Sequence, residues 1–550
     1  FAAANGLVSV TVADAAAFSA WNAPAGGAWT EPGNWTGGAP TSAGAQATFG
    51  VSAAVDVDAD VTVGSLLIDG AESLALGGAG TLTLANGGAA ALVEARTGSH
   101  AISAGLTLQG GAVLKAAAGA ALTLSGEIRA APGAAALLEI RGAGTVSVAG
   151  DCHVPILVAD TATLCMAEGA RIMAGVTVAA GAALRIDGTA ELAGTLNAPN
   201  GTFSAGSPDA ALVRGSAPER LSLHYSSSGP SPTMAFRNLD ALRRADLRYS
   251  TLGYAGAESG TLSADIILNG VSPEYTPTIR RLPGSGDLTF SGSVVANVKS
   301  GLQVQGDLDG EIALAGDWVA TAESCFRLGG GRIRLSGGYS LQNIWDLGHS
   351  LRVGGASGEE TVVTMDDGAR ISAYDLTLTP KAGAAGADVS FTQKGGAVTL
   401  RDGLTVGWLA SSSPKSYRLE GGTFMAGPTS WTRFLYGPSS LTVAGGEMSL
   451  GSMVFGEVGN GTSDYEVKQN PIASGSTRID VSGGALTVSG DLDLSGDACG
   501  HRYNRLTAGV GGTVSLPAAI RTAPGDGLAN GGAYTALVLD GGTINLTGRG

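Results

Sequence analysis

A two-glycine hinge between short alternating segments recurs six times in the second half of this 550-residue chain. Each copy precedes a run in which apolar and polar residues alternate, as in the segment 445–450 (Gly-Gly-Glu-Met-Ser-Leu). The first glycines are 26, 24, 38, 28 and 30 residues apart, at Gly395, Gly421, Gly445, Gly483, Gly511 and Gly541. A quasi-period of this length, built from period-2 segments, is typical of a solenoid whose coils each bury one face. The hinge therefore predicts an all-β fold, a parallel β-helix solenoid.

The composition favours the same architecture. Charged residues make up 14% of the chain, against roughly 25% in typical globular proteins. Long amphipathic helices need charged residues on their solvent-exposed faces, so this chain cannot be mostly helical. The 88 glycines suit tight corners between closely stacked strands. A solenoid core grows along one axis, and 550 residues need not be divided among several globular cores.

The formal net charge is −15, from 32 Lys and Arg against 47 Asp and Glu. An acidic surface disfavours nucleic acid, whose phosphates require a basic one, and also disfavours anionic membranes. No apolar run reaches the ~18 residues of a membrane span. No basic segment followed by an apolar one opens the chain, so we expect that any signal peptide has been removed. These features predict a secreted or cell-surface protein with no nucleic-acid partner and no membrane span in this segment.

The residue pattern and the glycine content change along the chain. Short alternating runs with glycine or alanine corners predict regular coils, whereas the stretch after residue 200 is poorer in glycine and richer in arginine. We expect an N-terminal strand or arm at 1–20, a Trp-rich capping module at 21–50, β-helix coils at 51–200, irregular coils with longer loops at 201–284, and coils with Gly-Gly hinges at 285–550.

Two groups of aromatic residues stand out. Trp21, Trp29 and Trp35 precede the first regular coil, and we expect them to close the open end of the solenoid, because a terminal coil must hide its core. The alternative is that clustered Trp side chains stack on sugars. The second group, Trp408, Trp431 and Tyr436, is interpreted as a loop cluster able to serve as a glycan-stacking platform.

The first twenty residues contain one alternating run, formed by Leu7, Val8, Val10 and Val12. A strand outside the main repeat is suited to pair with the sheet edge of another molecule. Head-to-tail contacts of that kind do not close and generate filaments. The chain itself is therefore the predicted partner, as a homo-oligomer or a filament.

The order of residues from Trp21 to Phe49 (Trp, Gly-Gly, Trp, Asn-Trp, Pro, Ala-Thr-Phe) resembles the N-terminal module of bacterial exported proteins with autotransporter-associated β-strand repeats. The likeness continues through 55–66 and the hinges from Gly395 to Leu546, and in outline covers most of the chain. The resemblance implies a parallel β-helix at, or released from, the cell surface, with an adhesin-like or structural role. One departure is that no translocator domain or sorting helix follows the coils. Either the chain is cut at Gly550, or it is secreted and assembled differently.

Parallel β-helices also include enzymes that cleave polysaccharides, which need carboxylates converging on one face of consecutive coils. The candidates are Asp366 and Asp367 with Arg370, and Asp307 with Asp309. Adjacent residues of a strand point to opposite faces, so Asp366 and Asp367 are better explained by a solvated turn. Asp307 and Asp309 are expected to share a face, and a surface stripe explains them equally well. The chain is therefore predicted to be non-enzymatic.

The sequence contains only weak candidates for a metal site and for a disulfide. Asp56, Asp58 and Asp60 alternate and are candidate calcium ligands, although an outward solvated stripe is the preferred interpretation because the glycine-aspartate nonapeptide repeat of calcium-binding β-helices is absent. Cys152 and Cys165 either form a disulfide or stay free and buried. They lack the further ligands of a zinc site. With no phosphate- or dinucleotide-binding motif, no cofactor is predicted.

Together these patterns predict a non-enzymatic extracellular β-solenoid with a structural or adhesive role, self-assembling head to tail. The alternative is a β-helix that binds surface glycans or cleaves polysaccharides.

Overall fold

The structure, a computed structural model, describes most of the chain. The described residues are 2–4, 7–9, 18–197, 202–207, 209–224, 233–268, 276–296, 300–320, 324–341, 351–354, 359–379, 387–407, 413–434, 438–455, 476–493, 503–517, 520–521 and 534–547.

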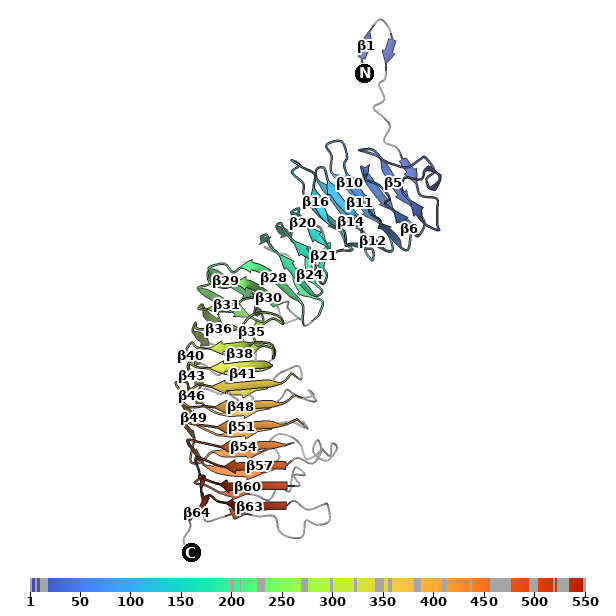
Figure 1. Cartoon of the computed structure of the whole chain (residues 1–550). Coiled ribbons are helices and arrows are strands. Elements are labelled where there is room, and N and C mark those ends of the chain that lie inside the picture. The colour runs from blue at the N-terminus through green and yellow to red at the C-terminus, as the bar shows by residue number, and fades with distance from the viewer. Residues whose placement is uncertain are drawn as a thin grey trace. The chain divides into compact units, whose positions relative to one another are not determined.

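The predicted fold is confirmed. Parallel strands stack coil upon coil, and the one helical element among the described residues is a short 3-10 turn, η1 (Pro32–Asn34). The chain divides into two compact units (Figure 1). Unit 1 comprises Phe1–Gly215 and Ser228–Met234, and unit 2 comprises Ser216–Ser227 and Ala235–Gly550.

Each coil of unit 1 after the first adds one strand to each of three parallel sheets, which we name after their first strands; the first coil contributes β3 and β4 alone. The β3 sheet contains β3 (Phe18–Ala20), β5 (Gln46–Phe49), β8 (Ser65–Ile68), β11 (Ala91–Ala95), β14 (Ala112–Ala116), β17 (Leu138–Gly142), β20 (Ile156–Val158), β23 (Val176–Val178) and β26 (Leu196–Asn197). The β4 sheet contains β4 (Gly27–Ala28), β6 (Ala53–Asp56), β9 (Leu74–Gly77), β12 (Ser99–Ile102), β15 (Ala121–Leu124), β18 (Thr145–Val148), β21 (Thr163–Met166), β24 (Ala183–Ile186) and β27 (Thr202–Ala205). The β7 sheet contains β7 (Val61–Val63), β10 (Thr81–Leu84), β13 (Gly105–Leu108), β16 (Ile128–Ala130), β19 (Asp151–Cys152), β22 (Arg171–Ile172), β25 (Thr189–Leu192) and β28 (Ala211–Ser216).

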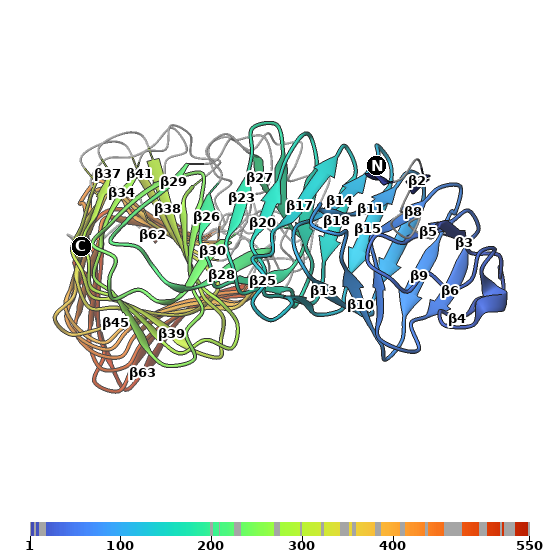
Figure 2. The ribbon, with the colours of Figure 1, turned by 90° about the horizontal axis from the view of Figure 1, so that it is seen from above.

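Unit 2 repeats this plan, and its coils lie one behind another when seen from above (Figure 2). The β29 sheet contains β29 (Arg220–His224), β31 (Arg244–Arg248), β34 (Asp265–Leu268), β37 (Val294–Ala296), β40 (Trp318–Ala320), β43 (Gly338–Leu341), β46 (Arg370–Ala373), β49 (Ala397–Leu400), β52 (Thr423–Ala426), β55 (Glu447–Leu450), β58 (Ala485–Val488), β61 (Thr513–Pro517) and β64 (Thr543–Thr547). The β32 sheet contains β32 (Thr251–Tyr254), β35 (Thr278–Arg281), β38 (Ser300–Gln305), β41 (Ser324–Leu328), β44 (Leu351–Val353), β47 (Leu376–Leu378), β50 (Leu404–Val406), β53 (Trp431–Phe434), β56 (Ser452–Phe455), β59 (Leu492–Asp493) and β62 (Ile520–Arg521). The β33 sheet contains β33 (Gly260–Leu262), β36 (Leu288–Phe290), β39 (Glu311–Leu314), β42 (Gly331–Leu335), β45 (Thr361–Met365), β48 (Val389–Gln393), β51 (Lys415–Leu419), β54 (Ser439–Val443), β57 (Ser476–Val481), β60 (Tyr503–Gly509) and β63 (Tyr534–Asp540). One further strand is β30 (Thr233–Asn238).

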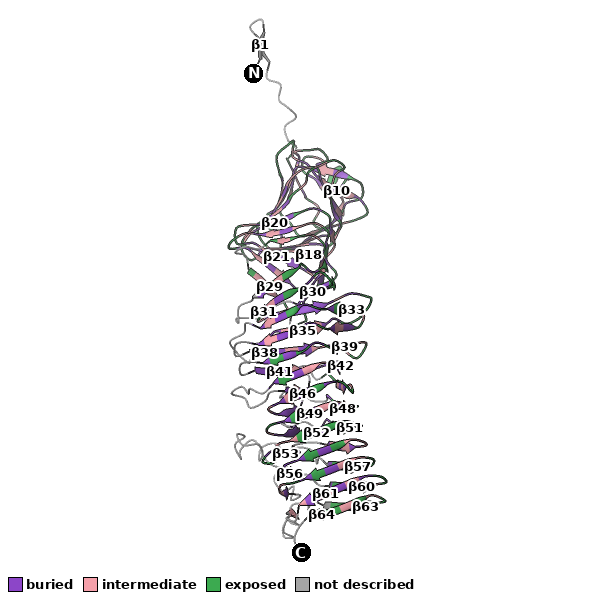
Figure 3. Ribbon diagram, turned by 90° about the vertical axis from the view of Figure 1, so that its left-hand side faces the viewer, coloured by how far each residue is buried: buried purple, intermediate pink, exposed green. Residues whose placement is uncertain are grey.

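Alternation along each strand builds the core. In β10, Leu82 and Leu84 are buried and Thr81 and Thr83 face outward. Parallel register places Leu82 directly beside Leu106 of the next coil, so identical side chains stack along the axis. The same in-out alternation of burial follows the strands through both units (Figure 3).

The six Gly-Gly hinges occupy one corner of unit 2. Each lies between a strand of the β33 sheet and the next strand of the β29 sheet, as Gly445 and Gly446 lie between β54 and β55. Gly446 has a φ of +70°, a conformation that side chains with a Cβ rarely adopt. A Cβ at this position would lie 2.4 Å from the carbonyl oxygen of Gly422 in the coil before. The hinge is therefore glycine because the corner needs left-handed backbone and the coils stack closely.

Replacing Gly446 with alanine is expected to lower the free energy of unfolding by about 1–2 kcal/mol, through strain at positive φ and contact with the coil before. Urea unfolding followed by circular dichroism measures the change. The matched control is Gly368→Ala, in a turn where a Cβ would meet no atom within 4 Å. If both variants shift the urea midpoint equally, the hinge explanation is wrong.

The N-terminal end of unit 1 is closed by the predicted aromatic cap. Trp21, Trp29 and Trp35 are all buried, and Trp29 has no exposed surface. The ring centroid of Trp35 lies 5.0 Å from that of Trp21, 4.9 Å from that of Trp29 and 5.6 Å from that of Phe49. Because these rings pack edge to face and are buried, their role in the structure is to cap the core.

The cap also satisfies the backbone of the first strands. Thr36 donates its N–H to the carbonyl of Ala20 in β3 (2.9 Å) and accepts the N–H of Ala20 at its hydroxyl (3.0 Å). Beside β4, Asn34 Nδ2 donates to the carbonyl of Ala28 (2.9 Å). Hydrogen-bonding groups that an edge strand would offer to another chain are thus already used.

The predicted single N-terminal strand is half of a hairpin. β1 (Ala2–Ala4) pairs antiparallel with β2 (Leu7–Ser9), and Ala3 lies opposite Val8. Leu7 and Val8 therefore have a partner strand within their own chain. Val10 and Val12 lie outside the described residues.

At the last described coil of unit 2, core-facing positions are exposed, in contrast to the capped end of unit 1. Leu537 and Leu539 of β63 are in register with the core residues Leu506 and Ala508, yet they are 44% and 62% exposed. Leu546 of β64 is in register with buried Leu516 and is 63% exposed. Within the described residues, the core cross-section at this end is uncovered.

Candidate functional site

The outer face of the β32 sheet carries a row of large polar side chains. Register pairs Gln303 with Arg327, Arg327 with Arg352, Arg352 with Thr377, Thr377 with Thr405, and Thr405 with Arg433 on successive strands from β38 to β53. The neighbours along each strand, such as Phe326 and Leu328 around Arg327, are buried in the core. Alternation therefore places the whole row on the outside of the sheet.

This outer face is shielded from solvent, unlike that of the neighbouring β29 sheet. Thr377 and Thr379 have no exposed surface, and Asp375 is 5% exposed. On the β29 sheet, by contrast, the outward-facing Val319 and Met425 are about half exposed. Polar groups out of water bind charged partners more strongly, because the local dielectric constant is lower. The face therefore combines polarity with shielding, as ligand sites commonly do.

Arg327 and Arg352 place two positive charges side by side on this face. They are nearest neighbours on adjacent strands and both are half-buried. Burial lowers the pKa of Arg352, and the positive charge of Arg327 lowers it further. Arg327 Nε is buried and has no hydrogen-bond partner among the described residues. Nearby, burial raises the pKa of the Cys325 thiol, against the opposing effect of the two arginines.

Asp375 and Thr377 lie on the next strand of the stack, Thr377 within β47 and Asp375 directly before it. The hydroxyl of Thr377 donates to Asp375 Oδ2 at 3.4 Å. Sequence reasoning missed Arg327, Arg352 and Asp375. The alternation in Leu351-Arg352-Val353 signals that Arg352 faces outward, but only the register shows that Arg327 lies beside it.

Trp431 lies on the same outer face, at the start of β53 and two residues before Arg433. Thr432 and Phe434 point inward and are buried, whereas Trp431 is only partly buried. Of the three predicted glycan-stacking residues in this region, Trp431 is therefore placed on the candidate face, and Trp408 and Tyr436 lie outside the described residues. A partly exposed indole can stack on a sugar ring.

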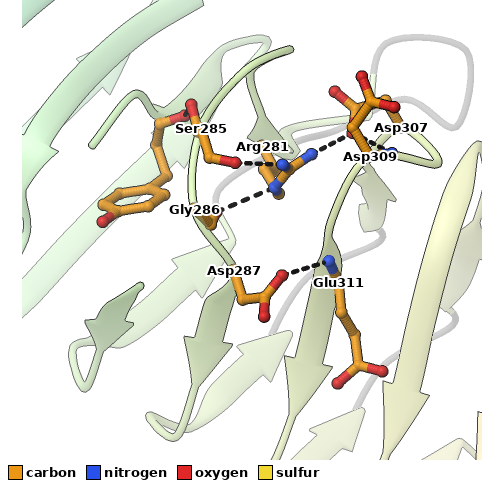
Figure 4. A network of polar contacts seen from close by, with 8 residues as sticks. Arg281, Ser285, Gly286, Asp287, Asp307, Asp309 and Glu311 are labelled. Carbon is orange, nitrogen blue, oxygen red and sulfur yellow. Dashed lines mark hydrogen bonds and ion pairs between the residues drawn. The ribbon is translucent and has the colours of Figure 1, made fainter. Parts of the chain in front are cut away.

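The predicted carboxylate pair Asp307 and Asp309 belongs to a structural network instead (Figure 4). Both residues lie in the turn between β38 and β39, so they do not share the face of a strand. Asp309 donates its backbone N–H to Asp307 Oδ1 (3.2 Å), and the same oxygen binds Nη1 of Arg281. Arg281 is fully buried, and its Nε donates to the carbonyl of Gly286 (2.9 Å) while its Nη2 donates to that of Ser285. The arrangement joins two coils at a corner.

Asp366 and Asp367 lie in the turn between β45 and β46, where the N–H of Ala369 donates to the carbonyl of Asp366 (3.1 Å). Asp366 Oδ2 is 3.5 Å from Nη1 of Arg334, whose Nε donates to Glu311 Oε1 (2.7 Å). Arg370 is exposed on the outer face of the β29 sheet. These groups are parts of surface ion pairs and a turn.

The three candidate calcium ligands are not brought together. Asp56 ends β6, and Asp58 and Asp60 lie in the turn that follows. Asp58 accepts the N–H of Thr30 (3.0 Å) from the coil before, whereas Asp60 accepts the N–H of Thr81 (2.8 Å) from the coil after. The hydrogen bonds from Thr30 lower the pKa of Asp58. All three carboxylates are exposed, as the solvated interpretation expects, but only Asp56 belongs to a strand, and a turn holds the other two.

The disulfide alternative is not formed. Cys152 and Cys165 are both free and buried. Cys152 faces the core from the β7 sheet, in register with Ile128 and Ile172, whereas Cys165 faces outward from the β4 sheet, beside Ser147 and Arg185. Their side chains thus lie on opposite sides of the coil wall. The Cys165 thiol donates to Asp187 Oδ2 (2.7 Å), and burial raises the pKa of both thiols to about 11.

Lys415 is a buried cation that sequence reasoning also missed. It occupies an inward position of β51, in line with Tyr417 and Leu419, and is 1% exposed. Burial lowers its pKa to about 8, and the negative charge of Asp388 acts in the opposite direction.

Lys415→Met is expected to raise the free energy of unfolding at neutral pH. It should also remove the pH dependence of that free energy above pH 8. The pKa of Lys415 is lower in the folded chain than in the unfolded chain, so between about pH 8 and 10.5 the unfolded chain binds more protons. The free energy of unfolding of the natural protein therefore rises with pH in this window. Urea midpoints at pH 7.5, 9 and 10.5 should show the advantage of the variant shrinking as pH rises. A difference that is constant with pH would contradict the assignment.

Comparisons with known proteins give no further identification: no family model, no curated protein and no solved structure matches the chain. Within the described part of the chain, no helix has the length and hydropathy needed to cross a membrane. Across the same residues, no group of three or more His, Cys, Asp or Glu side chains is arranged to hold a metal ion.

Proposed function

We propose that this protein is a non-enzymatic structural or adhesive β-solenoid that works outside the cell. The observation that carries the proposal is the stack of parallel coils in each unit, closed at the N-terminal end of unit 1 by a buried tryptophan cap. Such stacks are stiff because every coil is hydrogen-bonded to both neighbours. The resemblance to exported β-strand repeat proteins supports an extracellular location.

Self-assembly is the second part of the proposal. Within the described residues, Leu537, Leu539 and Leu546 form an exposed apolar surface beside strand edges, which favours the addition of another strand. The cap occupies the edges of β3 and β4, so the donor from a second copy would be the β1–β2 hairpin rather than the first coil. Head-to-tail contacts of this kind would extend into a filament.

Light scattering and electron microscopy of the purified chain over a range of concentrations test the assembly. Mass that grows with concentration, with fibres in the micrographs, is the expected result. Deleting residues 1–9 should return the protein to monomers, and Leu539→Lys should do the same from the other end. Monomers of the natural chain at high concentration would remove the self-assembly part and leave the structural role in place.

The second candidate function is carbohydrate binding, favoured by the partly exposed Trp431 on the outer face of the β32 sheet. Screening against an array of glycans, with Trp431→Ala as the comparison, tests binding. A reducing-end assay on each bound polysaccharide distinguishes binding from cleavage. Binding that is unchanged in Trp431→Ala would exclude this residue as a stacking platform.

A further inference from the structure

We propose that a groove on the outer face of the β29 sheet, over β40, β43, β46 and β49, binds a glycan that carries isolated carboxylates, and that Arg370 holds one of these carboxylates. The groove has a volume of about 410 Å³, within the range of small-ligand sites. It lies on a different sheet from Trp431, and ligand binding there does not rest on self-assembly.

Small side chains between larger ones form the groove. Register places Val319, Ser340, Ser372 and Thr399 in one row across four strands that follow one another along the stack (Figure 1). Val319, at one end of the row, is 44% exposed, and Met425, one strand beyond Thr399, is 50% exposed. Three strand spacings make the row roughly 14 Å long, so a ligand of more than one sugar ring fits along it.

Arg370 is the cation of the groove, in a second row two residues away along the strands. Its register partners are Gly338 and Ala397, so no large side chain stands beside the guanidinium on either adjacent strand. The side chain is exposed and forms no hydrogen bond or ion pair within the described part of the chain, where Asp366 lies beside Arg334 instead. The fork of N–H donors on a guanidinium matches the two oxygens of a carboxylate. An acidic group of a ligand is therefore the partner that Arg370 favours.

The rest of the groove favours a sugar over a peptide. β43 and β46 are paired on both sides, so their backbones cannot take up an extended peptide as a new strand. Binding must use side chains, and the exposed hydroxyls of Ser340 and Thr399 can both donate and accept. Val319 adds exposed apolar surface at one end. A sugar ring, with hydroxyls on its rim and C–H groups on its faces, matches this combination.

Asp317 disfavours a densely charged polyanion. Its carboxylate lines the same groove, two strands from Arg370, and accepts the backbone N–H of Gly338 at Oδ1 (3.0 Å). The groove thus holds one cation and one carboxylate on a protein with a net charge of −15. Phosphate and sulfate polymers need several cations close together. A glycan with isolated carboxylates needs only one.

Isothermal titration calorimetry of the full chain with hyaluronan tetrasaccharide, whose carboxylates alternate with neutral sugars, tests the site. Arg370→Gln should bind about tenfold more weakly, because a hydrogen bond between charged groups is lost. Ser340→Leu, which places a large side chain in the groove, should also bind more weakly. The charge-matched control is Arg332→Gln, which removes an exposed arginine from the outer face of the β33 sheet and should bind normally. Asp317→Asn keeps an oxygen for the N–H of Gly338 and removes the carboxylate, so it should bind at least as tightly as the natural chain.

Circular dichroism and thermal midpoints establish that each variant is folded. If Arg370→Gln does not fold, Arg370→Lys keeps the charge, loses the planar fork and should still bind more weakly. Equal weakening by Arg332→Gln would show a general charge effect and overturn the site. Equal binding of the methyl-esterified tetrasaccharide, or weaker binding by Asp317→Asn, would overturn the acidic ligand. Tighter binding of a glutamate hexapeptide would overturn the choice of a sugar. No binding of the tetrasaccharide would overturn the whole inference without bearing on the structural role, which light scattering tests separately.

Discussion

Replacing Trp29 with alanine is expected to lower the free energy of unfolding of unit 1 by about 3–5 kcal/mol, the range for deleting a fully buried aromatic side chain. Trp29 is completely buried, and its ring centroid lies 4.9 Å from that of Trp35 and 6.1 Å from that of Phe49. Its Nε1 also donates to the carbonyl of Pro40 (3.1 Å). Removing the indole leaves a cavity at the end of the core and frees the chain segment that covers β3 and β4.

Hydrogen exchange of unit 1 and urea unfolding measure the effect. Exchange should accelerate in the first coils before it does so elsewhere, because the loss is at one end of a stack in which each coil contacts only its neighbours. Trp431→Ala is the control, since this tryptophan is partly exposed and its removal should lower the free energy of unfolding by less. If the two substitutions destabilise equally, Trp29 does not act as a cap.

Replacing Asp307 with alanine is expected to destabilise unit 2 by about 3–5 kcal/mol, because it leaves the charge of Arg281 buried without its carboxylate. The side chain of Arg281 is 1% exposed and that of Asp307 is 21% exposed. The carbonyls of Ser285 and Gly286 accept from the same guanidinium but carry no charge to balance it. The corner between β38 and β39 would also lose the turn that Asp307 forms with Asp309.

A double-mutant cycle isolates the ion pair. Arg281→Met/Asp307→Ala should be more stable than Asp307→Ala alone, because the unpaired cation is gone. Asp309→Ala serves as the control for the turn, since Asp309 is exposed and contributes its backbone N–H rather than its side chain to the network. A double variant as unstable as Asp307→Ala would show that cavity formation, and not charge, dominates.

The sequence alone determined the architecture, because the information is local. The alternation in segments such as 82–84 and 441–443 specifies strands that bury one face, and the recurring Gly-Gly pair specifies a corner at a regular interval. The structure places all six hinges at one corner, and the positive φ of Gly446 gives the reason for the residue type. The tryptophan cap was predictable for a similar reason: three large apolar side chains within fifteen residues have to be buried near the first coil.

Only the tertiary structure decided which polar residues meet. Arg327 and Arg352 are 25 residues apart in sequence. No local pattern predicts that the two residues occupy equivalent positions on adjacent coils and are therefore neighbours. The same register buries Arg281 against Asp307 across a corner, separates Cys152 from Cys165 by the wall of a coil, and directs Asp58 and Asp60 to opposite neighbours. The physical reason is that a period of two fixes only whether a side chain points in or out. Its neighbours across the stack depend on the length of every intervening turn, which varies from coil to coil.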